Sequence, residues 1–148
     1  MADLVEKSVD LKASFDRVWK ALTDPEEFGT WFRVKFDGPF VVGETTTGQM
    51  TYPGSEHYRW ISKTVTMDRD TGIFAFTGVH AADPANPTED DPSTLVEFRL
   101  EKTPEGCRLP VRESGFKALP PDRRDEALRD NEQGWEIQTG NVKAYVES

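Results

Sequence analysis

The sequence has 148 residues, the usual size of a single domain that can bury a hydrophobic core. Hydrophobic residues make up 36% and charged residues 30% of the chain, an ordinary balance for a soluble protein. Its 18 basic and 27 acidic residues give a net charge of −9. This charge argues against nucleic acid or an anionic membrane as a main partner, since both attract clustered positive charge.

Cysteine content and hydropathy bear on the compartment. The single cysteine, Cys107, excludes an internal disulfide and fits a reducing environment. The chain does not open with a basic segment followed by an apolar core, and no apolar run approaches ~18 residues. We therefore expect one domain over residues 1–148, no membrane insertion and a cytoplasmic location.

The first elements are a predicted strand and two short helices. Residues 4–12 alternate between apolar and polar side chains, which is typical of a strand. Ser14 is a plausible N-cap for a helix with apolar residues at helical spacing. Asp24 starts a second helix, with proline at its first position and glutamate three residues after the cap. We expect this second helix to end near Gly29.

The middle of the chain is strand-like and punctuated by turn residues, so short connections predict antiparallel neighbours. The expected strands lie near residues 34–37, 45–52, 57–67, 72–80, 94–102 and 107–113. The proline-rich, acidic stretch 82–92 interrupts them and predicts a long surface loop. A cation-binding or entrance loop is the alternative, although the stretch lacks the spacing of a calcium loop.

Residues 121–147 predict one long amphipathic helix. Its apolar stripe contains Ala127, Leu128, Trp135, Val142, Tyr145 and Val146. Two polar residues, Asn131 and Gln138, lie inside this stripe beside Trp135. At roughly 40 Å the helix can cross a whole sheet. The order of elements predicts an α+β fold, with a curved antiparallel sheet of about six or seven strands and the long helix packed across it.

Glu113 is the sharpest candidate for chemistry. It shares a strand face with Leu109 and Val111, which should point at the core. A carboxylate there could accept a hydrogen bond from a ligand or act as a general base. It could equally be a structural carboxylate paired with arginine or backbone N–H groups. Asn131 and Gln138 could orient a polar group of a ligand, or bond to strand-end backbone or to Glu113.

The remaining motifs argue against other chemistries. His57 and His80 are the only histidines, and no cysteine or acidic residue lies at ligand spacing from them. Neither a nucleophile–histidine arrangement nor a glycine-rich phosphate loop is present. We therefore expect no metal and no cofactor, and we assign no catalytic residue.

Several blocks together resemble one family. They are Asp16-Arg17-Val18-Trp19-Lys20-Ala21-Leu22-Thr23-Asp24-Pro25, Trp31-Phe32, Thr94-Leu95-Val96-Glu97-Phe98-Arg99-Leu100, Glu113-Ser114-Gly115-Phe116 and Asn131-Glu132-Gln133-Gly134-Trp135. They resemble the START-like (SRPBCC, pollen-allergen-like) superfamily, and within it bacterial proteins similar to the C-terminal domain of the heat-shock protein 90 ATPase activator. The resemblance implies a helix-grip fold with a cavity between the sheet and the last helix. Many relatives carry an aromatic residue about where Gly78 stands, which implies a pocket that is wider or differently shaped at that point.

The resemblance implies binding of an apolar or amphipathic small molecule, and we expect a cavity of at least roughly 300 Å³ under the last helix. An enzyme of the cyclase, aromatase or hydrolase type that uses Glu113 is one alternative. A chaperone-associated interaction module, with a chaperone as partner and a link to the stress response, is another. The residues expected to line the cavity are Trp31, Phe74, Phe76, Phe98, Glu113, Asn131, Trp135, Gln138 and Val142.

Overall fold

The computed structural model describes residues 3–148. Its elements are β1 (Leu4–Leu11), α1 (Phe15–Thr23), α2 (Pro25–Phe32), β2 (Val34–Phe36), β3 (Thr45–Met50), β4 (Arg59–Asp68), β5 (Ile73–Val79), β6 (Ser93–Arg99), β7 (Glu101–Thr103), β8 (Gly106–Ser114), the short 3₁₀ helix η1 (Phe116–Ala118) and α3 (Pro121–Val146). This is the α+β order that the sequence predicts.

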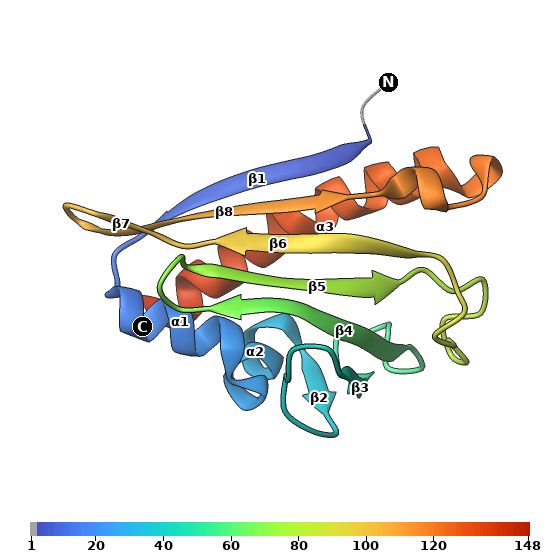
Figure 1. The fold of residues 1–148 in the computed structure, drawn as a ribbon, viewed down its shortest axis with the longest axis horizontal. Coiled ribbons are helices and arrows are strands. Elements are labelled where there is room, and N and C mark those ends of the chain that lie inside the picture. The colour runs from blue at the N-terminus through green and yellow to red at the C-terminus, as the bar shows by residue number, and fades with distance from the viewer. Residues whose placement is uncertain (1–2) are drawn as a thin grey trace.

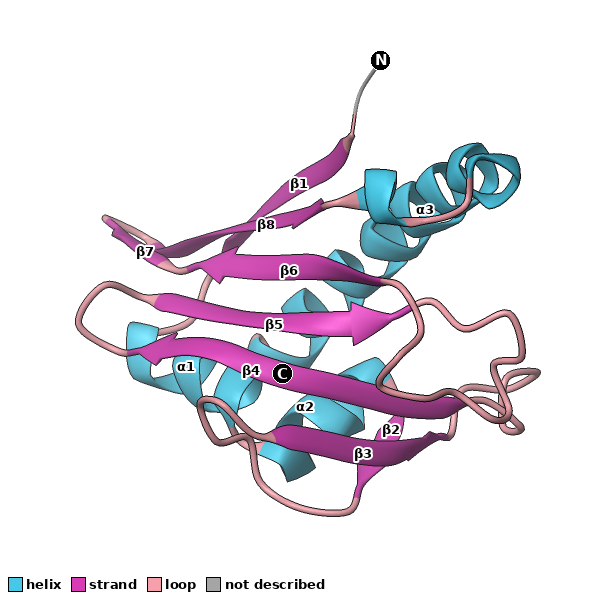
Figure 2. Cartoon of the chain, turned by 45° about the vertical axis from the view of Figure 1, so that its right-hand side comes forward, coloured by secondary structure: helices cyan, strands magenta, loops and turns pink. Residues whose placement is uncertain are grey.

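The strands form one antiparallel sheet in the order β1-β8-β6-β5-β4-β3-β2, and β7 pairs with β8 at one end. The three α-helices lie together on one face of this curved sheet, and α3 runs behind its strands (Figures 1 and 2). The fold class and the position of the long helix are therefore as predicted. The space between α3 and the sheet is where any internal cavity must lie.

The two short helices begin where the sequence predicts. The Ser14 side chain accepts a hydrogen bond from the Arg17 N–H at 3.2 Å, and the Asp24 carboxylate accepts one from the Glu26 N–H at 2.9 Å. These caps satisfy backbone donors that a first helical turn leaves free.

The predicted end of α2 near Gly29 is wrong, because the helix continues to Phe32. It ends at Arg33, whose left-handed backbone (φ 73°) returns its N–H to the Gly29 carbonyl at 2.8 Å. A Cβ atom at Gly29 would lie 2.0 Å from the Val34 carbonyl oxygen. The glycine therefore permits the close approach of β2 and does not terminate the helix.

Strand β4 contains an irregularity that simple alternation does not reveal. Its pairing with β5 shifts register between Thr64 and Thr66. A bulge of this kind reverses which residues face the core. In a regular strand Trp60 and Met67 would lie on opposite faces of the sheet. The bulge allows both side chains to pack against the core.

The core is built around Phe28 on α2, which is fully buried. Its ring lies 4.7 to 6.4 Å from seven other aromatic rings: Trp31, Phe32, Phe36, Phe40, Trp60, Phe76 and Phe98. Aromatic pairs at such spacings contribute packing beyond the buried area alone. This cluster fixes α2 against the concave side of the sheet.

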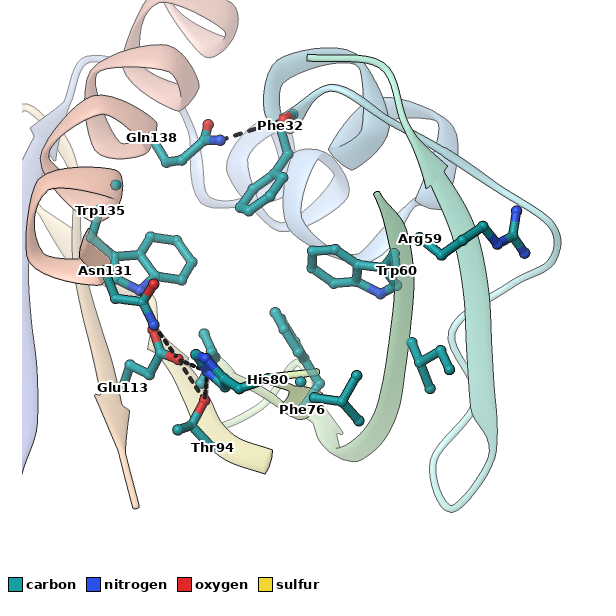
Figure 3. Close-up of a pocket in the computed structure, with 15 residues that line it drawn as sticks. Phe32, Arg59, Trp60, Phe76, His80, Thr94, Glu113, Asn131, Trp135 and Gln138 are labelled. Atoms are coloured by element: carbon teal, nitrogen blue, oxygen red, sulfur yellow. Dashed lines mark hydrogen bonds and ion pairs between the residues drawn. The ribbon is translucent and has the colours of Figure 1, made fainter. Parts of the chain in front are cut away.

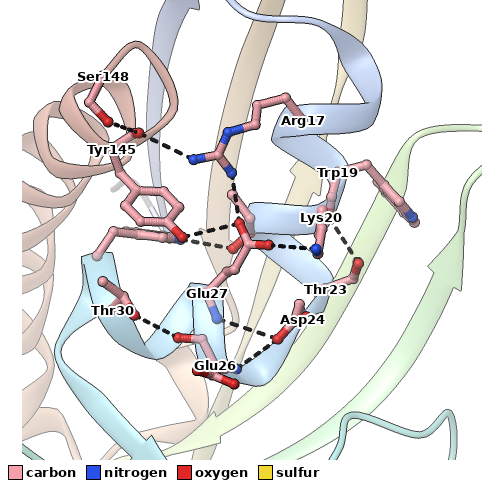
Figure 4. Close-up of polar contacts among 12 residues, drawn as sticks. Arg17, Trp19, Lys20, Thr23, Asp24, Glu26, Glu27, Thr30, Tyr145 and Ser148 are labelled. Atoms are coloured by element: carbon pink, nitrogen blue, oxygen red, sulfur yellow. Dashed lines mark hydrogen bonds and ion pairs between the residues drawn. The ribbon is translucent and has the colours of Figure 1, made fainter.

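A polar cluster holds the C-terminal end of α3 against the two short helices (Figure 4). The Glu27 Oε1 atom accepts hydrogen bonds from Arg17 Nη1 at 2.7 Å and from the Tyr145 hydroxyl at 3.1 Å. The Arg17 guanidinium also lies 4.7 Å from the centre of the Tyr145 ring. Because α3 is held here, its central turns have a defined position over the sheet.

Candidate functional site

A cavity of about 250 Å³ lies between α3, the end of α2 and the strands β4, β5, β6 and β8, and it is partly open to solvent. Figure 3 shows the side chains that surround it. It is lined by Phe32, Arg59, Trp60, Ile61, Phe76, Gly78, Val79, His80, Thr94, Val96, Glu113, Asn131, Gly134, Trp135 and Gln138. The volume is slightly below the roughly 300 Å³ that we expected.

Aromatic rings from four elements form much of the cavity wall. The ring of Trp60 lies 5.3 Å from that of Phe32 and 5.6 Å from that of Phe76. The ring of Trp135 lies 6.0 Å from that of Phe32 across the space. Such rings offer an apolar molecule large contact areas at little cost in side-chain entropy.

The opposite end of the cavity is polar and is organised by Glu113, which is only 4% exposed. Its Oε1 atom accepts a hydrogen bond from Trp135 Nε1 at 2.8 Å. Its Oε2 atom lies 2.5 Å from the Thr94 hydroxyl, 3.1 Å from Asn131 Nδ2 and 3.3 Å from His80 Nε2. A buried carboxylate is costly unless donors surround it, and this one has four.

The strand register explains why these groups meet. Glu113 pairs with Val5 on β1 and with Val96 on β6, so it lies within an apolar row of the inner face. Asn131 and Trp135 are four residues apart on α3 and therefore project from adjacent turns toward the same carboxylate. The predicted proximity of the last helix to Glu113 is present in the structure.

His80 is one of the lining residues that the sequence analysis missed, because it considered the histidines only as metal ligands or as partners of a nucleophile. It directly follows β5, and its Nε2 atom lies 2.9 Å from the Thr94 hydroxyl oxygen. A signal was available, since Phe74, Phe76, Gly78 and His80 share one strand face by period-two alternation. Following the inward face one step past Gly78 would have placed the imidazole in the cavity.

The nine residues proposed for the cavity divide into two groups. Phe76, Glu113, Asn131, Trp135 and Gln138 line it. Trp31, Phe74, Phe98 and Val142 are buried in the core and are not among its lining residues. The Trp31 Nε1 atom, for example, donates to the Ala21 carbonyl at 2.9 Å. These four side chains support the cavity wall from behind.

Gln138 contributes to the junction between helices more than to the polar cluster. Its Nε2 atom donates to the Phe32 carbonyl at 3.4 Å, and its Oε1 atom accepts from Asn141 Nδ2 at 3.1 Å. The backbone bond expected for this side chain was to a strand end, and the structure has it at the end of helix α2 instead. Asn131 shows the alternative expected for it, a bond to Glu113.

Two glycines leave space in the cavity wall. A Cβ atom added at Gly78 or at Gly134 would meet no heavy atom within 4 Å. Gly78 lies on β5 opposite Thr94, and Gly134 lies on α3 beside Trp135. Close packing therefore requires neither glycine, and together they enlarge the cavity.

Within residues 3–148, no group of three or more His, Cys, Asp or Glu side chains is placed to hold a metal ion. None of the helices in that range has the length and apolar character needed to cross a membrane.

Comparison with known proteins places this geometry in context. The profile of the family described as "Activator of Hsp90 ATPase homolog 1-like protein" matches residues 12–147. No match to the chain is found among curated proteins.

Solved structures with the same fold are numerous, and three illustrate the range. The protein MLL2253 from Mesorhizobium loti superposes with a TM-score of 0.75 at 23% identity, covering 96% of this chain and 95% of that one. The Aha1 dimer from Colwellia psychrerythraea gives 0.72 at 17% identity, with 99% and 97% covered. DynU16, a protein in the dynemicin biosynthetic locus, gives 0.78 at 20% identity, covering 100% of this chain and 48% of that one. The chain thus spans about half the length of DynU16. At these identities the likeness concerns the fold.

Proposed function

Because the chain belongs to the family of activator of Hsp90 ATPase homolog 1-like proteins, and has the START-like helix-grip fold, we propose that it binds an apolar or amphipathic small molecule in the cavity under α3. The observation that carries this proposal is the combination of an aromatic wall with an organised polar end. An apolar ring would contact Phe32, Trp60 and Phe76, and a polar substituent would face the cluster around Glu113.

The size of the cavity limits the ligand. Pockets for drug-sized molecules usually measure roughly 300–1,000 Å³. A cavity of about 250 Å³ suits a molecule of one or two rings, and its open side leaves room for a substituent. The buried carboxylate of Glu113 disfavours an anionic group at the polar end, since like charges repel at close range.

Naphthol, a two-ring compound with one hydroxyl group, is a suitable first probe. Trp60 and Trp135 line the cavity, so its binding should quench tryptophan fluorescence saturably. Native mass spectrometry of protein purified from its source cells should also show a retained small molecule. Absence of both saturable quenching and a retained molecule would overturn the proposal.

Two glycines on α3 provide a matched pair of variants. Gly134→Leu places a side chain in the cavity and should abolish naphthol binding. Gly140 lies on the same helix, is exposed and is not among the lining residues. Binding should therefore persist in Gly140→Leu. Both changes raise helix propensity similarly, so a difference between them reports on the cavity. Equal binding by the two variants would place the ligand elsewhere.

The family also supports a second candidate function, contact with a chaperone, because its description refers to an activator of Hsp90 ATPase. This role would require no ligand. The test is the ATPase rate of the heat-shock protein 90 from the same organism, with and without a molar excess of this protein. An unchanged rate would remove this candidate and leave the binding proposal intact.

A further inference from the structure

The hydrogen bonds around Glu113 are concentrated on one of its two oxygens. A carboxylate offers about four lone-pair directions. Trp135, Thr94, Asn131 and His80 supply four donors to its two oxygens. Three of these contacts fall on Oε2, the oxygen beside His80, so it has no free lone pair, whereas Oε1 accepts from Trp135 and keeps one. Its contacts orient the groups around it.

The same contacts define the proton positions on His80. The Thr94 hydroxyl has one hydrogen, and its distance of 2.5 Å to Glu113 Oε2 assigns that hydrogen to the carboxylate. The hydroxyl oxygen is then an acceptor for His80 Nε2 at 2.9 Å, and Nε2 carries a proton. In the neutral ring the other nitrogen, Nδ1, therefore holds the free lone pair. No hydrogen bond among the described residues engages Nδ1.

The backbone and a neighbouring ring hold this imidazole in place. The His80 N–H donates to the Pro92 carbonyl at 2.7 Å, and the His80 carbonyl accepts from Arg123 Nη2 at 2.8 Å. Its ring packs edge to face on Phe116 at 6.0 Å. The side chain is 20% exposed and lines the cavity (Figure 3). A histidine with one nitrogen oriented by a carboxylate is the arrangement that proton transfer requires.

We propose that His80 is a general base in this cavity, and that the site abstracts a proton from an activated C–H bond next to a carbonyl or a similar electron-withdrawing group. In that step Nδ1 takes the proton, the C–H electron pair forms the enolate double bond, and the carbonyl oxygen takes the charge. No oxidant or co-reactant is required, and return of the proton at another atom gives an isomer. Glu113 and Thr94 are positioning residues. The inference rests on the proposed binding function, since a base needs an occupant.

Asn131 can assist at the oxygen of the substrate. One of its side-chain N–H groups donates to Glu113, and no hydrogen bond among the described residues uses the other. A donor beside developing negative charge lowers the barrier to enolate formation. His80 and Asn131 both line the cavity, so a histidine for the proton and an amide donor for the oxygen belong to the same site.

Nitrobenzisoxazole tests the base directly. Removal of its ring C–H proton forms a nitrile as the N–O bond breaks, and the electron pair leaves on oxygen as a coloured phenolate. General bases of this kind contribute roughly 10²-fold or more. We expect His80→Gln to lower kcat for this elimination by about 100-fold. His57→Gln changes the only other histidine, which is exposed and is not among the lining residues, and should leave the rate unchanged.

Two further measurements separate a chemical role from a structural one. Glu113→Gln should lower kcat with little change in KM, because it disturbs the orientation of the base more than binding of the ring. Nitrogen NMR of the unaltered protein should show the Nε2–H tautomer of His80, whatever the stability of the variants. A His80 tautomer protonated on Nδ1 would overturn the proposal.

The outcomes distinguish this inference from the binding function. If naphthol binds but nitrobenzisoxazole reacts equally fast with the His80→Gln variant, the base is excluded and binding stands. If naphthol does not bind and native mass spectrometry finds no retained molecule, the binding function fails and the base fails with it. Binding together with a His80-dependent rate supports both.

Discussion

At Glu113, helix α3, strand β6 and the residue that follows β5 supply donors to one buried carboxylate, and Trp135 is the partner of Oε1. The aromatic side chain therefore has two roles. Its ring forms part of the cavity wall, and its N–H stabilises a charge that would otherwise be unpaired on that side. Removing a donor from a charged group costs more than removing one from a neutral carbonyl.

Two tryptophans allow this difference to be measured. Trp135→Phe removes the donor to Glu113 and should lower the free energy of unfolding by about 2–3 kcal/mol beyond the cost of the smaller ring. Trp31→Phe is the control, since Trp31 is equally buried but donates to the neutral Ala21 carbonyl, and its loss should cost about 1 kcal/mol beyond the shared change in ring size. Urea unfolding of both variants measures the two values. An equal loss would show that the carboxylate adds nothing.

Sequence periodicity predicts some features of the helices and strands and misses others. Alternation along β8 is enough to place Glu113 on the inner face, and helical spacing is enough to direct Asn131 toward the sheet. Two other features depend on distant parts of the chain. The bulge in β4 arises from its pairing with β5, and α2 passes Gly29 because β2 packs against that glycine.

The cavity itself is the least predictable feature from sequence. Whether Phe98 lines a space or fills the core depends on how neighbouring rings interlock, and no periodicity encodes this. Phe98 lies 5.7 Å from Trp135 and is 1% exposed, so it supports the wall from behind. Strand alternation could have predicted that His80 faces the cavity. Its role, however, depends on the contact with Thr94, which the sequence does not predict.

The attachment of α3 to the short helices gives a prediction for one hydroxyl group. Tyr145→Phe removes the donor to Glu27 at 3.1 Å and should lower the free energy of unfolding by about 1 kcal/mol. Amide exchange in the last two turns of α3 should accelerate more than exchange in the sheet. Tyr58→Phe is the control, because its partly exposed side chain makes no hydrogen bond among the described residues. Uniform acceleration throughout the molecule would contradict a local attachment.

The end of α3 should also respond to pH through Glu147. The Lys12 backbone N–H, followed by the Lys143 ammonium, lowers the pKa of the Glu147 carboxyl below its usual range. A pKa lowered by folding stabilises the native state above the pKa of the unfolded chain, and this contribution disappears as the pH falls through the folded-state value. Glu147→Gln should therefore unfold at a lower temperature than the unaltered protein at neutral pH.

In acid the two unfolding temperatures should converge, because the unaltered carboxyl is then protonated as well. Thermal unfolding followed by circular dichroism at a series of pH values measures the gap. A gap that stays constant from neutral to acidic pH would show that the carboxylate contributes no charge-dependent stability.

For the whole molecule, the open cavity lowers the free energy of unfolding below the value that a filled interior would give. Gly78 is in a strand that favours β-branched residues, and a Cβ atom there meets open space. Gly78→Val should raise the free energy of unfolding by about 1–2 kcal/mol, through strand propensity and apolar burial. The same methyl groups occupy the space next to Thr94, so naphthol binding should weaken. Stability and binding are then expected to change in opposite directions.

Gly140→Ala provides the comparison that separates the two effects. It should raise the free energy of unfolding by about 1 kcal/mol through helix propensity, and naphthol binding should not change because this position lies outside the cavity. Chemical unfolding and fluorescence titration of both variants test the contrast. If Gly78→Val raised stability without weakening binding, the open space at Gly78 would not be part of the binding site. Opposite changes at Gly78 alone would identify the space under α3 as a functional feature that the fold retains at the expense of stability.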